Sequence, residues 1–346
     1  MTADSIPTAH IRGIPDLLGV IPHLLGFHPT ESVVFIVIDQ TRVELTARAD
    51  LAELQPAGHI ELLVDRLLVR WPAARVWVVA YSRSEQAGWR VLRRAAAHLA
   101  HAVAGEPICV SGRWYRVGDI DAPRHAHDPA SSQSAASATV HGLQARPSRS
   151  VLRRSVQIDP DQAYEAECAW LAATERLQNL ASDARPAAMV TALRAGLSNP
   201  AQLTRDELVW LAALCLDPDA RDRALIAITH DNAEACVELW VLVVRACPMG
   251  LQGHALALVG WAGWVSGNGA LQCVCLEELD AIQASLPLQR MLNDLNQAIV
   301  PPSFWTELRA KLAAALTPLD ESQMGADEAA GGIGEPHGEC ADDQVA

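Results

Sequence analysis

A histidine-rich segment is the first place in this sequence where side chains could bind a metal ion. His125, His127, Asp128 and His141 lie close together, and imidazole and carboxylate groups suit zinc or another divalent ion. A His-x-His pair in a polar loop, however, lacks the fixed spacing of a structural zinc site. The segment therefore favours a solvated loop, and the sequence assigns no metal.

An arginine cluster comes next in the chain and could bind an anion. Its members surround the start of a short expected helix: Arg146, Arg149, Arg153 and Arg154. Ser148 or Ser150 could cap that helix, and exposed N–H groups together with guanidinium groups suit phosphate or carboxylate. The alternative is a capped surface helix whose arginines lie in water or pair with the acidic C-terminal half.

A second pair of charges could contribute to the same anion site. Arg48 and Asp50 end an expected strand, and strand ends in α/β sheets often face a ligand crevice. Asp50 could equally cap the turn that begins at Leu51, with Arg48 as its ion-pair partner. The proposed anion site depends on these two segments meeting in the fold, and it comprises Arg48, Asp50, Arg146, Ser148 and Arg149.

Other suggestive patterns predict structure rather than a site. Cys273 and Cys275 are two residues apart on an expected helix, so they diverge by about 200° and cannot chelate one ion together. The segment 267–269 (GNG) is typical of a helix stop and turn. Trp261 and Trp264, one helical turn apart, indicate core packing. The sequence shows no nucleophile elbow, zinc-finger spacing or dinucleotide-binding fingerprint.

The charge of the 346-residue chain is unevenly distributed. The net charge is −14, yet residues 1–157 carry 17 arginines against 14 acidic residues. Residues 158–346 carry 10 basic and 27 acidic residues. This asymmetry indicates contact between the halves or, less favoured, an anionic partner for the first half. The strongly acidic charge of the whole chain argues against nucleic-acid binding.

Periodicity predicts a mixed α/β N-terminal half. Residues 14–26 contain Pro15 at a helix start and Gly26 as a C-terminal cap, and Pro22 should divide the segment into two short turns. Strands are expected over 33–38, 43–49, 76–81, 107–111 and 113–117, and helices over 60–71 and 88–103. The order ββαβαββ predicts a mixed β-sheet with packed helices.

The rest of the chain is predicted to be helical up to an acidic tail. Residues 119–134 resemble a loop, and helical signals joined by short turns run from 161 to 316, which is typical of a bundle. After Pro318 there are eight acidic residues and no basic ones, so the tail should be disordered. We therefore expect an α+β fold with a mixed α/β domain (1–157), a helical domain (158–317) and a disordered tail (318–346).

The cysteines and the N-terminus favour a soluble cytoplasmic protein. The eight cysteines lie mostly in apolar helical patterns, where free thiols behave as small hydrophobes. The N-terminus has no signal-peptide pattern. The longest uncharged apolar stretch, residues 255–265, is too short to span a bilayer.

Several blocks resemble a known family. They are IPDLLGVIPHLLGFHPTESVV (14–34), LTARADL (45–51), VWVVAYS (76–82), GRWYR (112–116), RPSR (146–149) and WAGWVSGNGAL (261–271). In this order they resemble the actinobacterial domain-of-unknown-function family 4192 over about residues 11–310. The resemblance implies an actinobacterial cytoplasmic protein and no particular activity. Members often carry cysteines after the GRW block, whereas residues 119–132 contain none, so no cysteine metal or redox role carries over.

Two hypotheses about function remain open from the sequence. The first is a non-catalytic binding or regulatory protein whose halves present a shared surface to a protein partner or a small anion. The second is an enzyme or ligand-binding protein that acts on an anionic small molecule such as a phosphate or nucleotide. Convergence of Arg48 and Asp50 with residues 146–149 would favour the second. The sequence identifies neither catalytic residues nor a cofactor.

Overall fold

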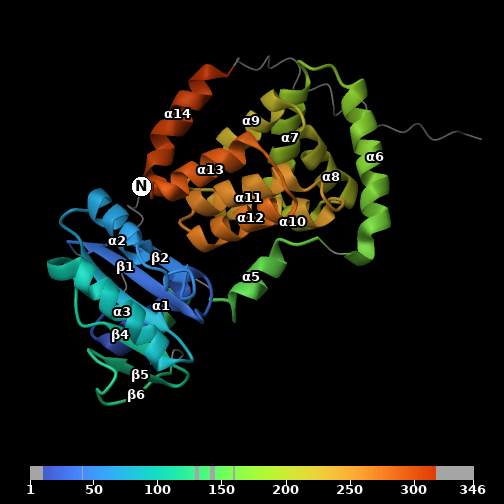
Figure 1. The fold of residues 1–346 in the computed structure, drawn as a ribbon. Helices are drawn as coiled ribbons and strands as arrows, with labels where there is room; N and C mark the ends of the chain where they lie inside the picture. Colours follow the sequence, from blue (N-terminus) through green and yellow to red (C-terminus); the bar gives the residue numbers. More distant parts are fainter. Residues whose placement is uncertain (1–10, 41, 129–131, 141–144, 159, 317–346) are drawn as a thin grey trace, which may run out of the picture.

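A six-stranded mixed sheet organises the N-terminal half of the computed structural model, which describes residues 11–40, 42–128, 132–140, 145–158 and 160–316. Its strands are β1 (Ser32–Asp39), β2 (Arg42–Asp50), β3 (Arg75–Tyr81), β4 (Ile108–Ser111), β5 (Trp114–Val117) and β6 (His125–Ala126), in the order β2-β1-β3-β4-β5-β6. Among the described strands only β3 and β4 pair in parallel. The predicted mixed sheet, the hairpin of β1 and β2, and the α+β class are confirmed (Figure 1).

Helix α1 (Ile14–Leu25) lies against one face of the sheet and corrects a prediction. Gly26 ends it in the left-handed conformation at φ 74°, as expected, but Pro22 lies inside a continuous helix. The proline removes one backbone hydrogen bond. Burial of seven residues of α1, Pro22 among them, stabilises the helix against that loss.

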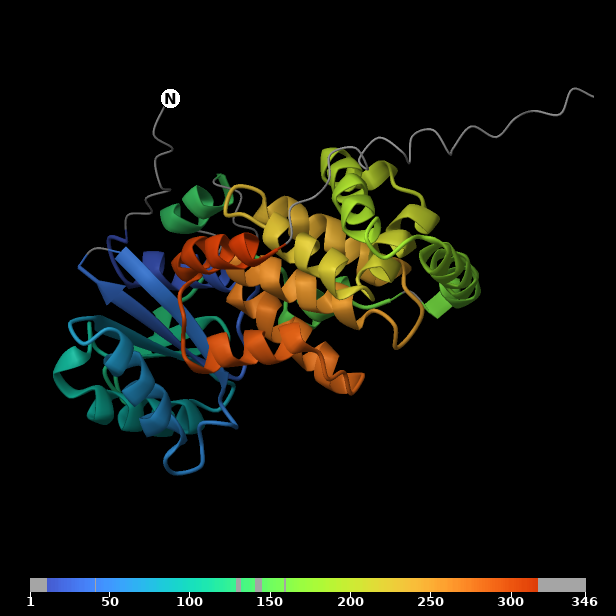
Figure 2. The same cartoon turned by 90° about the horizontal axis from the view of Figure 1, so that it is seen from above.

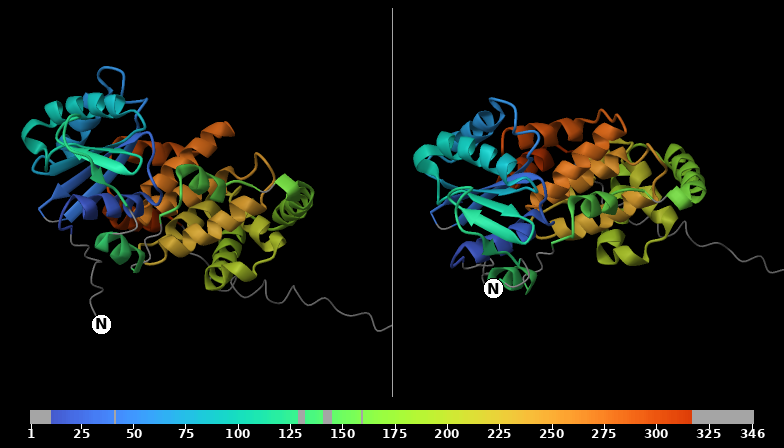
Figure 3. Two further views of the ribbon diagram at one scale, coloured as in Figure 1. Left: turned by 90° about the horizontal axis from the view of Figure 1, so that it is seen from below. Right: turned by 60° about the horizontal axis from the view of Figure 1, so that its bottom comes forward.

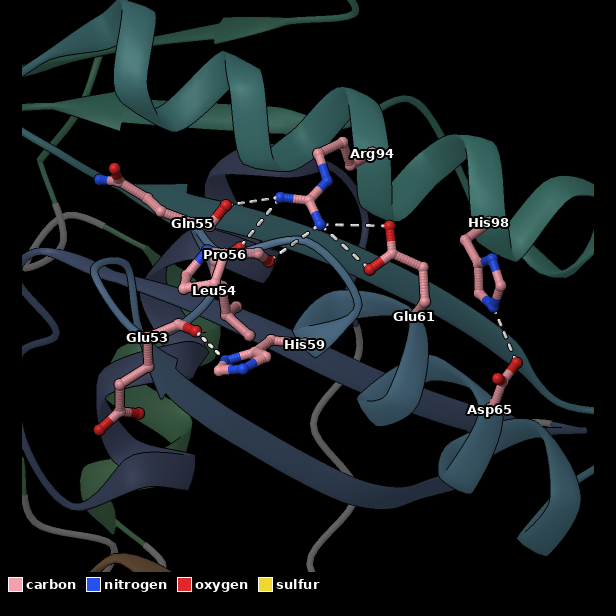
Figure 4. A network of polar contacts seen from close by, with 9 residues as sticks. All are labelled: Glu53, Leu54, Gln55, Pro56, His59, Glu61, Asp65, Arg94 and His98. Atoms are coloured by element: carbon pink, nitrogen blue, oxygen red, sulfur yellow. Dashed lines mark hydrogen bonds and ion pairs between the residues drawn. The ribbon is translucent and has the colours of Figure 1, made fainter.

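The opposite face of the sheet is covered by α2 (His59–Arg70) and α3 (Glu85–Leu99). Alternate strand residues such as Val33, Phe35 and Val78 point to this side, where they pack with Trp89 of α3. Figure 4 shows how polar contacts join the two helices. Arg94 of α3 donates to the Gln55 carbonyl at 2.8 Å and pairs with Glu61 of α2 at 3.1 Å.

Residues 119–134, predicted as a loop, contain the two-residue strand β6, and the helix α4 (Gln133–Val140) begins at their end and continues beyond them. Helix α4 packs closely on α1, because a Cβ atom on Gly19 would lie 1.9 Å from the Ser132 hydroxyl. Both elements were missed because they are short and polar, so their position depends on tertiary contacts. Residues 129–131 and 141–144 lie outside the described part of the chain.

The C-terminal half is helical, as predicted, from α5 to α14. The helices are α5 (Arg149–Ser155), α6 (Ala163–Asn179), α7 (Arg185–Ser198), α8 (Arg205–Leu214), α9 (Pro218–Ala227), α10 (Ala233–Ala246), α11 (Gly253–Val265), α12 (Gly269–Ala281), α13 (Pro287–Gln297) and α14 (Trp305–Ala315). Every residue of α11 from Ala255 to Val265 is buried, so this helix forms the centre of the half. None of the helices in the described ranges is both long and apolar enough to cross a bilayer.

The two halves lie side by side and share a hydrophobic core. Figures 2 and 3 show the sheet at one end of the molecule and α6 at the other. One buried cluster includes Ile36 and Val79 of the sheet, Leu152 of α5 and Leu276 of α12. The buried cluster therefore continues from the sheet into the helices. The division near residue 157 and the tail from 318, which lies outside the described residues, remain predictions.

Candidate functional site

A cleft of 480 Å³ opens at the carboxyl ends of β3 and β4. Ligands of α/β sheets usually bind at this edge, because loops that leave neighbouring parallel strands diverge there. The lining comes from the end of α1, the segment before β1, the ends of β3 and β4, and the residues after β6. It consists of Pro22, His28, Pro29, Thr30, Glu31, Tyr81, Ser82, Arg83, Val110, Gly112, Arg113, His127 and Asp128.

Glu31 is held in a fixed position at this cleft. Its backbone has φ 45°, a left-handed conformation that residues other than glycine adopt at a cost. One carboxylate oxygen accepts the Arg83 backbone N–H at 2.7 Å, and the other lies 3.4 Å from the Ser82 hydroxyl. The Glu31 carbonyl accepts the Leu51 N–H at 2.9 Å. The carboxylate is thus oriented by uncharged donors.

Two guanidinium groups extend from the strand ends. Arg83 follows β3, and Arg113 lies in the turn between β4 and β5. Both are exposed, and neither side chain makes a hydrogen bond or ion pair with the residues that the structure describes. The backbone of Arg113 is anchored, because its carbonyl accepts the His127 N–H at 2.8 Å. These groups are available to an anion without the loss of an existing contact.

Two imidazoles at the cleft are held in the uncharged form at neutral pH. Burial lowers the pKa of His28 below its usual 6.5, and the neighbouring His23 lowers it further. Burial also lowers the pKa of His127, an effect that Asp128 opposes and His28 reinforces. Neutral imidazoles can donate or accept a hydrogen bond. They can also accept a proton at physiological pH.

Tyr81 contributes a protonated hydroxyl beside the same cleft. Burial raises the pKa of this phenol far above its usual value, so it stays protonated. The hydroxyl oxygen is buried and has no hydrogen-bond partner among the described residues. An unpaired buried hydroxyl is destabilising, which distinguishes this position from ordinary core packing.

Most of the residues predicted from the sequence as an anion site have partners within the chain. Arg48 pairs with Asp50 at 2.6 Å, and the Ser148 hydroxyl caps α5 by accepting the Val151 N–H at 3.4 Å. Arg149 pairs with Glu277 of α12 through contacts of 2.8 and 2.5 Å.

Arg146 is exposed. Its backbone N–H donates to the Gly26 carbonyl, and its carbonyl accepts the His28 N–H. The sequence left open whether the two segments converge. Glu277 and, more weakly, Asp50 raise the pKa of Arg149, which indicates that the end of β2 lies near the start of α5.

The guanidinium group of Arg149 already binds an anion from within the chain, the carboxylate of Glu277. The carboxylate of Glu277 occupies the guanidinium bidentately, and Arg153 pairs with the adjacent Glu278. This is the pairing with the acidic half that the sequence left as an alternative. An external anion at Arg149 would have to displace Glu277, whereas Arg83 and Arg113 have no such competitor. The cleft is therefore the stronger candidate site.

We expect a measurable coupling between Arg149 and Glu277 because their contact joins α5 to α12. A double-mutant cycle with Arg149→Gln and Glu277→Gln should give a coupling free energy of about 0.5–1 kcal/mol, since both groups are partly exposed. The measurement is urea unfolding of the four proteins. The matched control is the pair Lys311 and Glu307 on α14, which is more exposed and should couple less. Equal coupling in both pairs would contradict a joining role.

The histidine segment brings two of its residues to the cleft. His127 and Asp128 line it, while His125 stacks on Tyr115 with ring centroids 5.1 Å apart, and His141 lies outside the described residues. No group of three metal-ligating side chains occurs within the described ranges. Sequence reasoning missed Glu31, Tyr81, Arg83 and Arg113. Their shared signal is a position at or next to the end of a strand, which becomes informative once β3 and β4 are known to be parallel.

These features define an α+β protein with a polar cleft at its parallel strand ends and a helical half packed beside the sheet. The chain belongs to the family described as a domain of unknown function (DUF4192), whose model matches residues 15–303. Searches of curated proteins and of solved structures found no match. Three blocks that carried the family resemblance, 14–34, 76–82 and 112–116, contribute lining residues to the cleft.

Proposed function

We propose that the protein is a binding protein for a small molecule that carries an anionic group, and that the cleft at β3 and β4 is its binding site. The observation that carries this proposal is the pair of unpartnered guanidinium groups, Arg83 and Arg113, at adjacent strand ends. Guanidinium groups bind carboxylates and phosphates through charge-assisted hydrogen bonds. Among the described residues, no carboxylate pairs with either guanidinium group.

The shape and lining of the cleft support a small ligand. Its volume of 480 Å³ lies in the range of about 300–1,000 Å³ that is usual for small-molecule sites. Pro22, Pro29 and Val110 supply an apolar wall, while His28 and His127 add uncharged hydrogen-bonding groups. A site of this composition suits a compact molecule with an apolar body and a charged end.

The test is binding of a panel of small anions to the full-length protein and to Arg113→Gln. Simple carboxylates, N-acetyl amino acids and phosphate monoesters at millimolar concentration should include compounds that raise the melting temperature. Calorimetry on those compounds should show that Arg113→Gln weakens binding about tenfold or more, because it removes one charge-assisted contact.

The matched control is Arg93→Gln. Arg93 is an exposed arginine on α3 that does not line the cleft, so its replacement should leave binding unchanged. The proposal is wrong if no anion in the panel binds. It is also wrong if Arg113→Gln and Arg93→Gln bind as the unmodified protein does.

The other sequence hypotheses remain proposals with less support. The anion site at Arg48, Asp50, Arg146, Ser148 and Arg149 has less support because Asp50 pairs with Arg48 and Glu277 pairs with Arg149. An enzymatic role finds support in the imidazoles of His28 and His127, which are uncharged at neutral pH as a general base requires. A cytoplasmic location finds support in the described cysteines, which are unpaired and in most cases buried.

A further inference from the structure

Acidic and basic residues lie at the same edge of the sheet in this cleft, because the start of β1 pairs with the end of β3, and their charges bear on the ligand. Glu31 precedes β1, whereas the guanidinium groups follow β3 and β4. Arg83 contributes its backbone N–H, and not its guanidinium, to the Glu31 carboxylate. The cleft therefore presents a carboxylate and guanidinium groups that do not neutralise each other by contact.

The Glu31 carboxylate is also held in advance of binding. The Arg83 N–H and the Ser82 hydroxyl fix its two oxygens, and the backbone is kept at φ 45° although this conformation is unfavourable for glutamate. Glu31 remains exposed, so the lone pairs not used by these donors are accessible from solvent. A fixed anion of this kind binds a cation with little loss of side-chain entropy.

We infer that the ligand is zwitterionic and resembles an amino acid, with an ammonium group bound by Glu31 and a carboxylate bound by Arg113 and Arg83. This inference rests on the proposed function, because it assigns the charge pattern of the ligand of the same cleft. It excludes simple phosphate esters as the preferred class, since they would leave the Glu31 carboxylate without a cation and close to their own negative charge.

The experiment uses calorimetry to compare the affinities with which three forms of the same compounds bind the full-length protein. L-amino acids carry both charges, their N-acetyl derivatives lack the cation, and their amides lack the carboxylate. The free amino acids should bind about tenfold more tightly than either derivative, because each derivative loses one charged contact. The N-acetyl derivatives should still bind the unmodified protein more tightly than they bind Arg113→Gln.

Glu31→Gln isolates the ammonium contact. Glutamine can still accept the Arg83 N–H, so the backbone arrangement should persist. In this variant the preference for a free amine should fall to about twofold or less, while N-acetyl derivatives bind as before or more tightly. Glu44→Gln, an exposed glutamate near the other end of the sheet on β2, should retain the full preference.

The outcomes separate this inference from the proposed function. If phosphate esters or N-acetyl acids bind at Arg113 and free amino acids show no preference, the zwitterionic ligand is wrong and the anion-binding cleft stands. If the preference exists but survives in Glu31→Gln, the assignment of Glu31 is wrong. If no compound with an anionic group binds, the proposed function fails and the inference fails with it.

Discussion

Replacing Trp305 with alanine should lower the free energy of unfolding by about 3–5 kcal/mol. The indole is fully buried at the start of α14, and its ring lies against Trp261 and Trp264, with centroid separations of 5.2 and 6.4 Å. Its Nε1 donates to the Ile228 carbonyl at 2.8 Å. The change therefore leaves a large cavity beside the central helix and a carbonyl without its partner. Urea unfolding followed by circular dichroism measures the loss.

The control for this prediction is Trp114→Ala on β5. Trp114 is 48% exposed, so its removal opens no cavity and should cost much less. Trp305 also lies just beyond the family match, which ends at residue 303. If Trp305→Ala were as mild as Trp114→Ala, α14 would not be part of the helical core.

Local sequence patterns predicted most of the fold, because the apolar residues and capping residues of these elements indicate them without knowledge of long-range contacts. The continuous burial of β1 follows from its unbroken apolar run, which is typical of a strand covered on both faces. The start of α12 at Asn268, which accepts the Leu271 N–H, follows from capping rules. Pro22 was misjudged for the opposite reason. Its effect depends on how deeply α1 is buried, which no rule about proline alone contains.

The candidate site was predictable only in part, since it depends on which strands are parallel. The sequence indicated strand ends as the place for a ligand and marked His127 and Asp128. It could not show that Arg83 and Arg113 follow neighbouring parallel strands, because pairing in a sheet is set by long-range contacts. Glu31 was also hidden, because its positive φ and its contact with Arg83 exist only in the folded chain.

The arginine cluster shows how the folded chain decides which charges stay available to a ligand. Asp50 lies near enough to Arg149 to raise its pKa, although Glu277 raises it more strongly. The partner that decides the outcome is Glu277, which lies 128 residues away from Arg149 in the chain. The sequence marked these charges and left their convergence open, because their partners are set by contacts between residues far apart in the chain.

Trp89 should give the second large loss of stability, on the other side of the sheet. This indole of α3 is fully buried in the cluster formed with β1, β3 and α2, so Trp89→Ala should cost about 3–5 kcal/mol in urea unfolding.

Phenylalanine variants should distinguish the contributions of the indole N–H groups at the two tryptophan positions. The Trp89 Nε1 is buried without a partner among the described residues, so Trp89→Phe removes an unsatisfied donor and should cost only about 1 kcal/mol. Trp305→Phe breaks the bond to Ile228 and should cost about 1–3 kcal/mol more than Trp89→Phe. Equal losses for the two phenylalanine variants would mean that ring volume alone sets their contribution and that the Trp305 hydrogen bond adds nothing to stability.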